Sequence, residues 1–537
     1  MKRVRSAPGD GGRVKAASCR SVRRRRHRDK ASSCQFLPAA LFDRIAILSL
    51  FRNDPLCQQC DISEGAQDTM QGFDFDKLPE DIVCHIHSLI PLRDAACLAS
   101  MSHRFLRSWR CFPNLTFDLE ALNLNVCEGT SYEKEKKLVD RIDNILQNHS
   151  GVGVKTLKLN VSTCFKLITA DHINNWLHAV IKPGILDIAV EFPVDHRWFD
   201  LSCSLLSCAG SSVQSISLFS CAFHPTLRTG CFKSLKTVYL KFVHITSEEL
   251  ECLLSSTVLL EKLEIRSCDQ LTFLNIPSHL QQLTILHVVF CTRLQMVEIH
   301  APKLITFYFR GPPMKILTSN SSCLKYMTLH GTLFSGMIHY ARTKLHSFAS
   351  NLQSLTLVSS KEAFNTPMLP EKFLHLRNLN ICFDDIGFQS YDYFSLASFL
   401  EACPALESFY MWAGEYDAGW QDPALQDSNA DSLHIRRIPE FSHANLKKVF
   451  INRFPPSKCL IELTYLIIES ASSLQRLKID TGYGFDTRGM CKRMNKADVI
   501  QAVKALDVIK RYIEGKVPSS VKFNVLEPCK RCHIAKL

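Results

Sequence analysis

Cysteine and histidine come together at the end of the chain as Cys529-x-x-Cys532-His533. This string matches the haem c attachment spacing, but no export signal precedes it. Cys529, Cys532 and His533 could instead form half of a zinc site, with Cys491 brought close by folding. Structural zinc usually takes four ligands with a second pair, so we favour a terminal loop with reduced thiols and expect neither metal nor cofactor.

Other patterns that carry catalysis are missing from the sequence. There is no P-loop and no G-x-S-x-G elbow, and Gly482-Tyr483-Gly484 stands alone as a turn. The histidines are scattered, and His287 and His300 lie in or beside predicted strands. Since no nucleophile is paired with a base, the sequence predicts no catalytic residue and a protein that is not an enzyme.

The basic charge lies at the N-terminus. Residues 1–30 hold 12 Lys and Arg against 2 Asp and Glu, which is most of the formal charge of +12 carried by 537 residues. A nucleic-acid-binding domain would cluster its cations on a folded surface, so such binding is not expected. Residues 1–35 are predicted to be disordered. Arg23 to Arg28, RRRRHR, reads as a nuclear import signal, a solvated basic tail or part of a transit peptide.

Nothing in the composition indicates a membrane or secreted protein. Residues 36–51 are an amphipathic helix candidate, in which Asp43 and Arg44 interrupt the apolar residues. No apolar run in the sequence approaches ~18 residues, the length needed to span a membrane. The 23 cysteines follow no signal peptide, which favours free thiols in a reducing compartment. We therefore expect the protein in the nucleus, the cytoplasm or both.

Three short helices are predicted between Leu78 and Trp109. Pro79 suits the first turn of a helix, and Ile82, Ile86 and Leu89 follow as one apolar stripe that ends before Pro91. Asp94 can cap a second helix, and a third carries Phe105, Leu106 and Trp109. Three such helices cannot build a core of their own, so they need a partner surface.

This stretch resembles an F-box in its opening LPEDI, its central LIPLRDA and its closing SHRFLRSW. The resemblance implies docking onto the Skp-type adaptor of a cullin-RING ubiquitin ligase. The alternative is a helical cap on the next domain. The adaptor-binding residues that the resemblance implies are Leu78, Pro79, Ile82, Ile86, Leu89, Pro91, Leu92, Leu98 and Trp109.

After Phe112 the chain repeats the apolar spacing L-x-x-L-x-L. The steps between copies are mostly 20–30 residues, but two steps near residue 300 are only 11 and 10. Such a repeat is typical of a leucine-rich-repeat solenoid, in which each copy adds one strand to a parallel sheet. The copies are Val154–Leu159, Val213–Leu218, Leu235–Leu240, Leu260–Ile265, Leu283–Val288, Leu294–Ile299, Leu304–Phe309, Leu324–Leu329, Leu352–Leu357, Leu376–Ile381, Leu406–Met411, Leu446–Ile451 and Leu474–Ile479.

Two further features complete the predicted architecture. Cys221, Cys268 and Cys291 occupy the position that supports the turn leaving each strand, so they are interpreted as structural. Residues 497–512 predict a helix and residues 521–526 a strand, which together would cap the solenoid.

The order of these parts is similar to the plant F-box/leucine-rich-repeat proteins. We therefore predict an α/β chain: a three-helix F-box, a solenoid with parallel strands on its concave face, and a C-terminal helix-strand cap. The predicted parts are a basic tail at 1–35, an amphipathic helix and linker at 36–70, the F-box at 71–117, the solenoid at 118–485, and the cap and tail at 486–537.

The target-binding surface is predicted from strand alternation. The residue between the last two apolar positions of each copy must point to the opposite face of the sheet, where such residues would stack as a ladder. Its most aromatic and charged part is Tyr239, Glu264, His287, Glu298 and Tyr308. The sequence thus predicts the substrate-recognition subunit of a Skp-cullin-F-box ligase, or alternatively an interaction protein outside the ligase. It names neither the target nor any trigger or small-molecule ligand.

Overall fold

In the computed structural model, all of the described residues belong to the unit Asp74–Leu537. The predicted basic tail, the amphipathic helix at 36–51, Cys491, Cys532 and His533 lie outside the described residues. The described ranges are 78–101, 103–125, 129–164, 166–194, 199–226, 232–318, 323–332, 336–345, 351–362, 364–384, 391–414, 422–425, 433–482 and 494–529.

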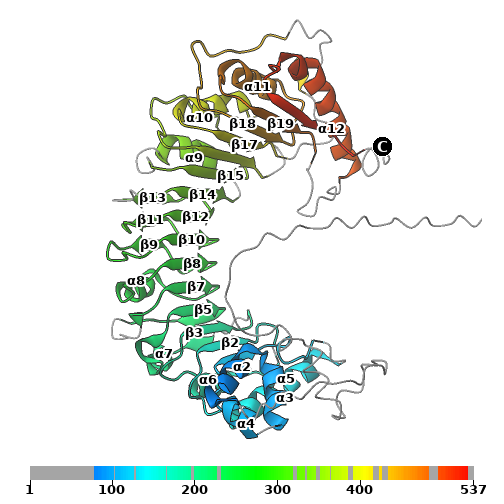
Figure 1. Cartoon of the computed structure of the whole chain (residues 1–537). Helices are drawn as coiled ribbons and strands as arrows, with labels where there is room; N and C mark the ends of the chain where they lie inside the picture. Colours follow the sequence, from blue (N-terminus) through cyan, green and yellow to red (C-terminus); the bar gives the residue numbers. More distant parts are fainter. Residues whose placement is uncertain are drawn as a thin grey trace, which may run out of the picture. The chain divides into compact units, whose positions relative to one another are not determined.

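The three predicted helices are confirmed as α2 (Glu80–Leu89), α3 (Leu92–Met101) and α4 (His103–Trp109) (Figure 1). Pro79 is the residue before α2, and the chain turns extended at Ile90 before Pro91. The prediction that Asp94 caps the second helix is wrong: α3 already begins at Leu92, so Asp94 lies within its first turn. A carboxylate there still favours the positive end of the helix.

These helices share a core with the solenoid. Leu92 and Trp109 belong to the same cluster of buried residues as Leu115 and Leu157. The ring of Trp109 lies 5.6 Å from that of Phe112, which stands two residues before the first strand of the sheet. The helical unit is therefore packed against the start of the repeats.

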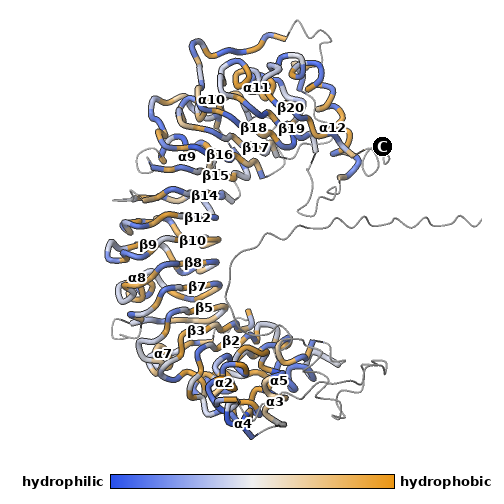
Figure 2. The backbone as a smooth tube through the Cα atoms, in the orientation of Figure 1, coloured by the Kyte–Doolittle hydropathy of each residue, from blue (hydrophilic) through white to orange (hydrophobic). Residues whose placement is uncertain are grey.

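The solenoid is built on one parallel sheet of 15 strands (Figure 1). Leucine-rich strands bury alternate side chains, and Figure 2 shows hydrophobic residues recurring along them. The strands in spatial order are β1 (Asn114–Phe117), β2 (Thr156–Asn160), β3 (Asp187–Glu191), β5 (Ser215–Phe219), β7 (Thr237–Lys241), β8 (Lys262–Arg266), β10 (Ile285–Val289), β12 (Thr306–Gly311), β14 (Tyr326–Gly331), β15 (Ser354–Ser359), β16 (Asn378–Phe383), β17 (Ser408–Trp412), β18 (Lys448–Asn452), β19 (Arg476–Asp480) and β20 (Lys522–Leu526).

The segments between these strands differ along the chain. Three of them form a second parallel sheet, β13 (Lys315–Thr318), β11 (Met296–Ile299) and β9 (Phe273–Ile276), and β4 (Phe199–Leu201) pairs with β6 (Cys221–Phe223). The short repeat steps near residue 300 arise because the copy at 294–299 is β11, in that second sheet. Helices in other segments are α5 (Ser131–Asn148), α6 (Ala170–Val180), α7 (Cys203–Cys208), α8 (Ser247–Ser255), α9 (Met337–Lys344), α10 (Ala397–Ala402) and α11 (Lys458–Ser470).

The structural reading of the repeat cysteines is confirmed. Cys221, Cys268 and Cys291 are fully buried. Burial raises the pKa of the Cys221 thiol to about 12 and that of Cys291 to about 11. Thiols this far from ionisation are poor nucleophiles, so these three side chains serve packing.

The predicted helix and strand at the C-terminal end are also present. Helix α12 (Lys496–Val508) is capped by Asn495, whose side chain accepts a hydrogen bond from the Asp498 amide. β20 then pairs in parallel with β19 and ends the long sheet.

Candidate functional site

Helix α2 presents apolar side chains on two different faces. Val83 is 1% exposed and His87 is fully buried, so these two point into the core. Ile82 is 40% exposed and Leu89 is 58% exposed, with Ile86 half-buried between them. We call Pro79, Ile82, Ile86 and Leu89 the apolar stripe. Its residues recur at helical spacing and therefore share one side of α2.

The remaining predicted adaptor residues divide by burial. Leu92 is 5% exposed and Trp109 is 4% exposed, so both support the core and offer little surface to a partner. Pro91 is exposed next to the apolar stripe, while Leu78 and Leu98 are half-buried. The predicted adaptor residues thus divide into side chains buried in the core and side chains that remain exposed.

The core beneath the stripe contains a histidine that sequence reasoning did not select. His87 Nε2 lies 2.9 Å from the Ala95 carbonyl oxygen, and Nδ1 lies 2.8 Å from Ser108 Oγ. These bonds join α2 to both α3 and α4. Burial lowers the pKa of His87, against the opposing effect of the hydrogen bond to Ala95. The neutral ring can donate to Ala95 and accept from Ser108, which fixes the three helices around it.

Part of the predicted ladder forms on the long sheet. Tyr239 pairs in register with Glu264, Glu264 with His287, and His287 with Tyr308. The rings of His287 and Tyr308 lie 5.5 Å apart. We call the side of this sheet that carries these residues the outer sheet face.

The predicted place of Glu298 in this ladder is wrong. Glu298 lies on β11, where its partners are Asn275 of β9 and Leu317 of β13 in the second sheet. The same apolar spacing produces strands in both sheets, and spacing alone does not tell them apart. Its carboxylate lies 3.7 Å from His300 Nε2.

The charge of Glu264, in the part of the ladder between Tyr239 and Tyr308 (the central ladder), is neutralised by its neighbours. Glu264 is only 6% exposed and lies 2.6 Å from Arg266 Nε, 3.1 Å from Lys262 Nζ and 3.5 Å from His287 Nδ1. Burial alone would raise the pKa of Glu264, but the hydrogen bonds from Arg266 and Lys262 hold it below its usual value. The Glu264 carboxylate is therefore a buried negative charge that is already paired with Lys262 and Arg266.

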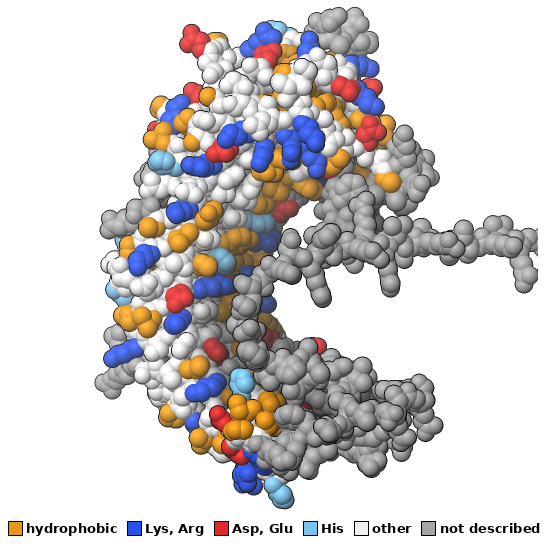
Figure 3. Space-filling model, in the orientation of Figure 1, with side chains coloured by type: hydrophobic (Ala, Val, Ile, Leu, Met, Phe, Trp, Pro, Cys, Tyr) orange, Lys and Arg blue, Asp and Glu red, His pale blue; other side chains and the backbone are white. Residues whose placement is uncertain are grey.

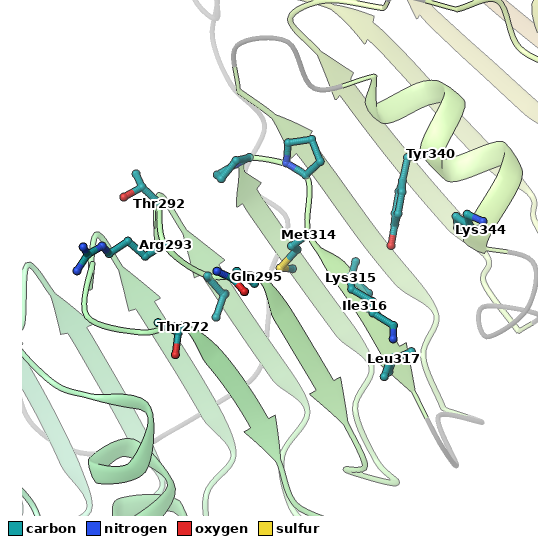
Figure 4. Close-up of a pocket in the computed structure, with 13 residues that line it drawn as sticks. Thr272, Thr292, Arg293, Gln295, Met314, Lys315, Ile316, Leu317, Tyr340 and Lys344 are labelled. Atoms are coloured by element: carbon teal, nitrogen blue, oxygen red, sulfur yellow. The ribbon is translucent and has the colours of Figure 1, made fainter.

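A groove of about 1120 Å³ lies beside the second sheet, where α9 replaces the next strand (Figure 4). Tyr340 on α9 points toward Lys315 and Ile316 of β13 (Figure 4), and burial raises the pKa of its hydroxyl. Among the described residues that line the groove, none offers a nucleophile paired with a general base. The groove is lined by Thr272, Thr292, Arg293, Leu294, Gln295, Pro312, Pro313, Met314, Lys315, Ile316, Leu317, Tyr340 and Lys344.

In the part of the chain that the structure describes, no three His, Cys, Asp or Glu side chains gather as a metal ion would require. Cys529 is partly buried, and its three potential co-ligands, Cys491, Cys532 and His533, lie outside that part. No described helix has the length and apolar character needed to span a bilayer.

Comparison with known proteins agrees with this architecture. The putative FBD-associated F-box protein At5g56400 of Arabidopsis thaliana is 28% identical over 221 residues, 40% of this chain and 46% of that protein. The Arabidopsis F-box/FBD/LRR-repeat protein At1g13570 is 22% identical over 325 residues, 57% of this chain and 69% of that protein. The match thus spans less than half of the first relative's length.

A solved structure of the LRR protein LIC12759 from Leptospira interrogans covers 71% of this chain and 97% of its own, at 11% identity and a TM-score of 0.29. The model of the At1g61320/AtMIF1 LRR domain matches residues 145–530. With the three helices at its N-terminal side, the chain is a plant F-box/leucine-rich-repeat protein and belongs to the At1g61320/AtMIF1 LRR-domain family.

Proposed function

We propose that this chain is the substrate-recognition subunit of a Skp-cullin-F-box type E3 ubiquitin ligase. Helices α2 to α4 dock a Skp-type adaptor, and the solenoid captures a target protein. The chain then acts by holding the target near ubiquitin chemistry performed on other subunits, which raises the effective concentration of the reacting groups.

The observation that carries this proposal is the exposed apolar stripe on α2. Single exposed hydrophobic residues are common on proteins, but Ile82 and Leu89 flank half-buried Ile86 on one side of one helix. The core of the unit is already complete without them, because Val83, His87 and Trp109 fill it. Apolar surface left over after folding, in a unit resembling an F-box, fits a protein partner.

A second candidate function is a leucine-rich-repeat interaction protein outside the ligase, with the helices serving only as a cap. The packing of Trp109 and Leu92 into the same core as the first repeats favours this reading. A cap, however, needs only its inward face, so it gives no role to the stripe.

The discriminating experiment is an adaptor pull-down with the double variant Ile82→Asp and Leu89→Asp. The matched control is Val258→Asp with Leu374→Asp, since Val258 is 49% and Leu374 59% exposed elsewhere on the molecule. Losing a buried interface anchor costs ~2–4 kcal/mol, so we expect the stripe variant to lose capture and the control to retain it. Equal capture by both variants would show that the stripe is not the docking surface.

A further inference from the structure

The C-terminal third of the long sheet carries cations in register on its outer sheet face. Lys448 on β18 pairs with Arg476 on β19, and Arg476 pairs with Lys522 on β20. All three side chains are exposed. Lys478 follows two residues after Arg476 on the same face. Figure 3 shows Lys and Arg side chains gathered over the region of β17–β19.

These cations differ from those of the central ladder. Lys262 and Arg266 both pair with the buried Glu264. Within the described ranges, by contrast, no carboxylate lies within 4.0 Å of the cationic groups of Lys448, Arg476, Lys478 or Lys522. Their charge is therefore available to a partner.

An aromatic pair adjoins the cations. The rings of Tyr410 on β17 and Phe450 on β18 are parallel within 1°, with centroids 4.7 Å apart. Tyr410 is 37% exposed. In register the row reads Asn380, Tyr410, Phe450, Lys478, so the two rings stack on each other along the sheet. Rings stacked face to face along the sheet leave their edges to face outward, and aromatic edges carry positive partial charge.

We propose that this surface, made of Tyr410, Phe450, Lys448, Arg476, Lys478 and Lys522, docks an acidic segment of a protein that also carries an aromatic residue. Neighbouring strands are about 4.8 Å apart, so the row from Lys448 to Lys522 spans roughly 10 Å. Alternate side chains of an extended peptide lie roughly 7 Å apart on one side. Carboxylates at i and i+2 therefore reach this row together.

The stacking geometry favours a peptide over a nucleic acid. Single-stranded nucleic acids bind through bases stacked on free aromatic faces. Here the facing sides of the two rings cover each other, and their outer sides point along the sheet toward Asn380 and Lys478. Ring edges suit carboxylates and the face of a partner aromatic ring. This surface would serve the target capture proposed above, and rests on it for its biological role.

The test uses the full chain and a fluorescein-labelled octapeptide of glutamates interrupted by phenylalanine, followed by fluorescence anisotropy without adaptor. Each exposed ion pair contributes modestly to binding, and three such pairs are lost together. The triple variant Lys448→Glu, Arg476→Glu and Lys522→Glu should therefore weaken peptide binding by about tenfold or more. A control with the same change of net charge is Lys158→Glu, Lys315→Glu and Lys325→Glu, all exposed elsewhere. It should bind as the wild type does.

Three results would overturn this assignment. Wild-type affinity in the first triple variant would remove these cations from binding. An equal loss in both triple variants would reduce the effect to net charge. A single-stranded oligothymidine that binds more tightly than the peptide would make the surface a nucleic-acid site. Because the adaptor is absent, each of these outcomes leaves the adaptor-docking proposal to its own test.

Discussion

Trp109 gives the sharpest prediction about how the helical unit holds together. Its ring is 4% exposed and lies 5.6 Å from the ring of Phe112, 6.3 Å from that of His87 and 6.5 Å from that of His149. A buried tryptophan covers roughly 150–250 Å² and contributes about 4–6 kcal/mol at ~25 cal/mol per Å². Trp109→Ala should therefore destabilise the unit by ~3–5 kcal/mol, the range for such truncations.

The assay must resolve local unfolding, because repeats contact mainly their neighbours and need not unfold together. Native-state hydrogen exchange at the α2–α4 amides gives the free energy of opening of this unit directly. Leu89→Ala is the matched control. Leu89 is 58% exposed, so its truncation should change stability by less than about 0.5 kcal/mol. If Trp109→Ala leaves exchange in α2–α4 unchanged, the division between core and docking residues is wrong.

Three further outcomes are expected. Since burial lowers the pKa of His87, its neutral form stabilises the fold at neutral pH, and that stability should decline as the pH falls below about 6.5. Urea titrations at high and low pH should show a shallower decline of stability in His87→Gln than in the wild type. Part of the decline should remain, because burial also lowers the pKa of His149 and of His443. The buried carboxylate of Glu135 accepts hydrogen bonds from the backbone amides of Lys166, Leu167 and Ile168. Glu135→Ala leaves these amides without that acceptor and should lower the melting temperature by several degrees. Deleting residues 1–35 should leave adaptor capture intact, and it should move a fluorescent fusion from nucleus toward cytosol if Arg23 to Arg28 direct import. An unchanged distribution of the fusion would refute the import signal. Cleavage of the tail in cells would favour a transit peptide.

Much of the fold follows from apolar spacing alone. All but one of the predicted repeat copies are strands of the long sheet, because alternate burial against the next repeat requires leucine-like residues at those positions. The exception, Leu294–Ile299, is β11 in the second sheet. The apolar spacing indicates that a strand buries one of its sides, but it does not indicate whether the strand belongs to the long sheet or to the second sheet. β3 also keeps the spacing as Ile185, Ile188 and Val190, a copy that is not among the predicted ones.

The sites were less predictable because they depend on side-chain packing and distances, which the spacing of residues along the chain does not give. The stripe of Ile82, Ile86 and Leu89 is visible in the sequence, but only the packing of α3 and α4 against Val83 and His87 shows that it faces outward. Likewise, Glu264 was selected as a binding residue by its position. Its two flanking cations come from the same strand, yet their mutual neutralisation appears only once side-chain distances are known.

Direct binding of the purified full chain to a purified Skp-type adaptor tests the central claim, and isothermal titration calorimetry measures it without labels. The apolar stripe predicts saturable binding by the wild type, with a negative heat-capacity change from apolar burial. The variant Ile82→Asp with Leu89→Asp should give no measurable heat of binding, while Val258→Asp with Leu374→Asp should match the wild type. A wild-type chain that shows no binding to the adaptor would contradict the proposed function.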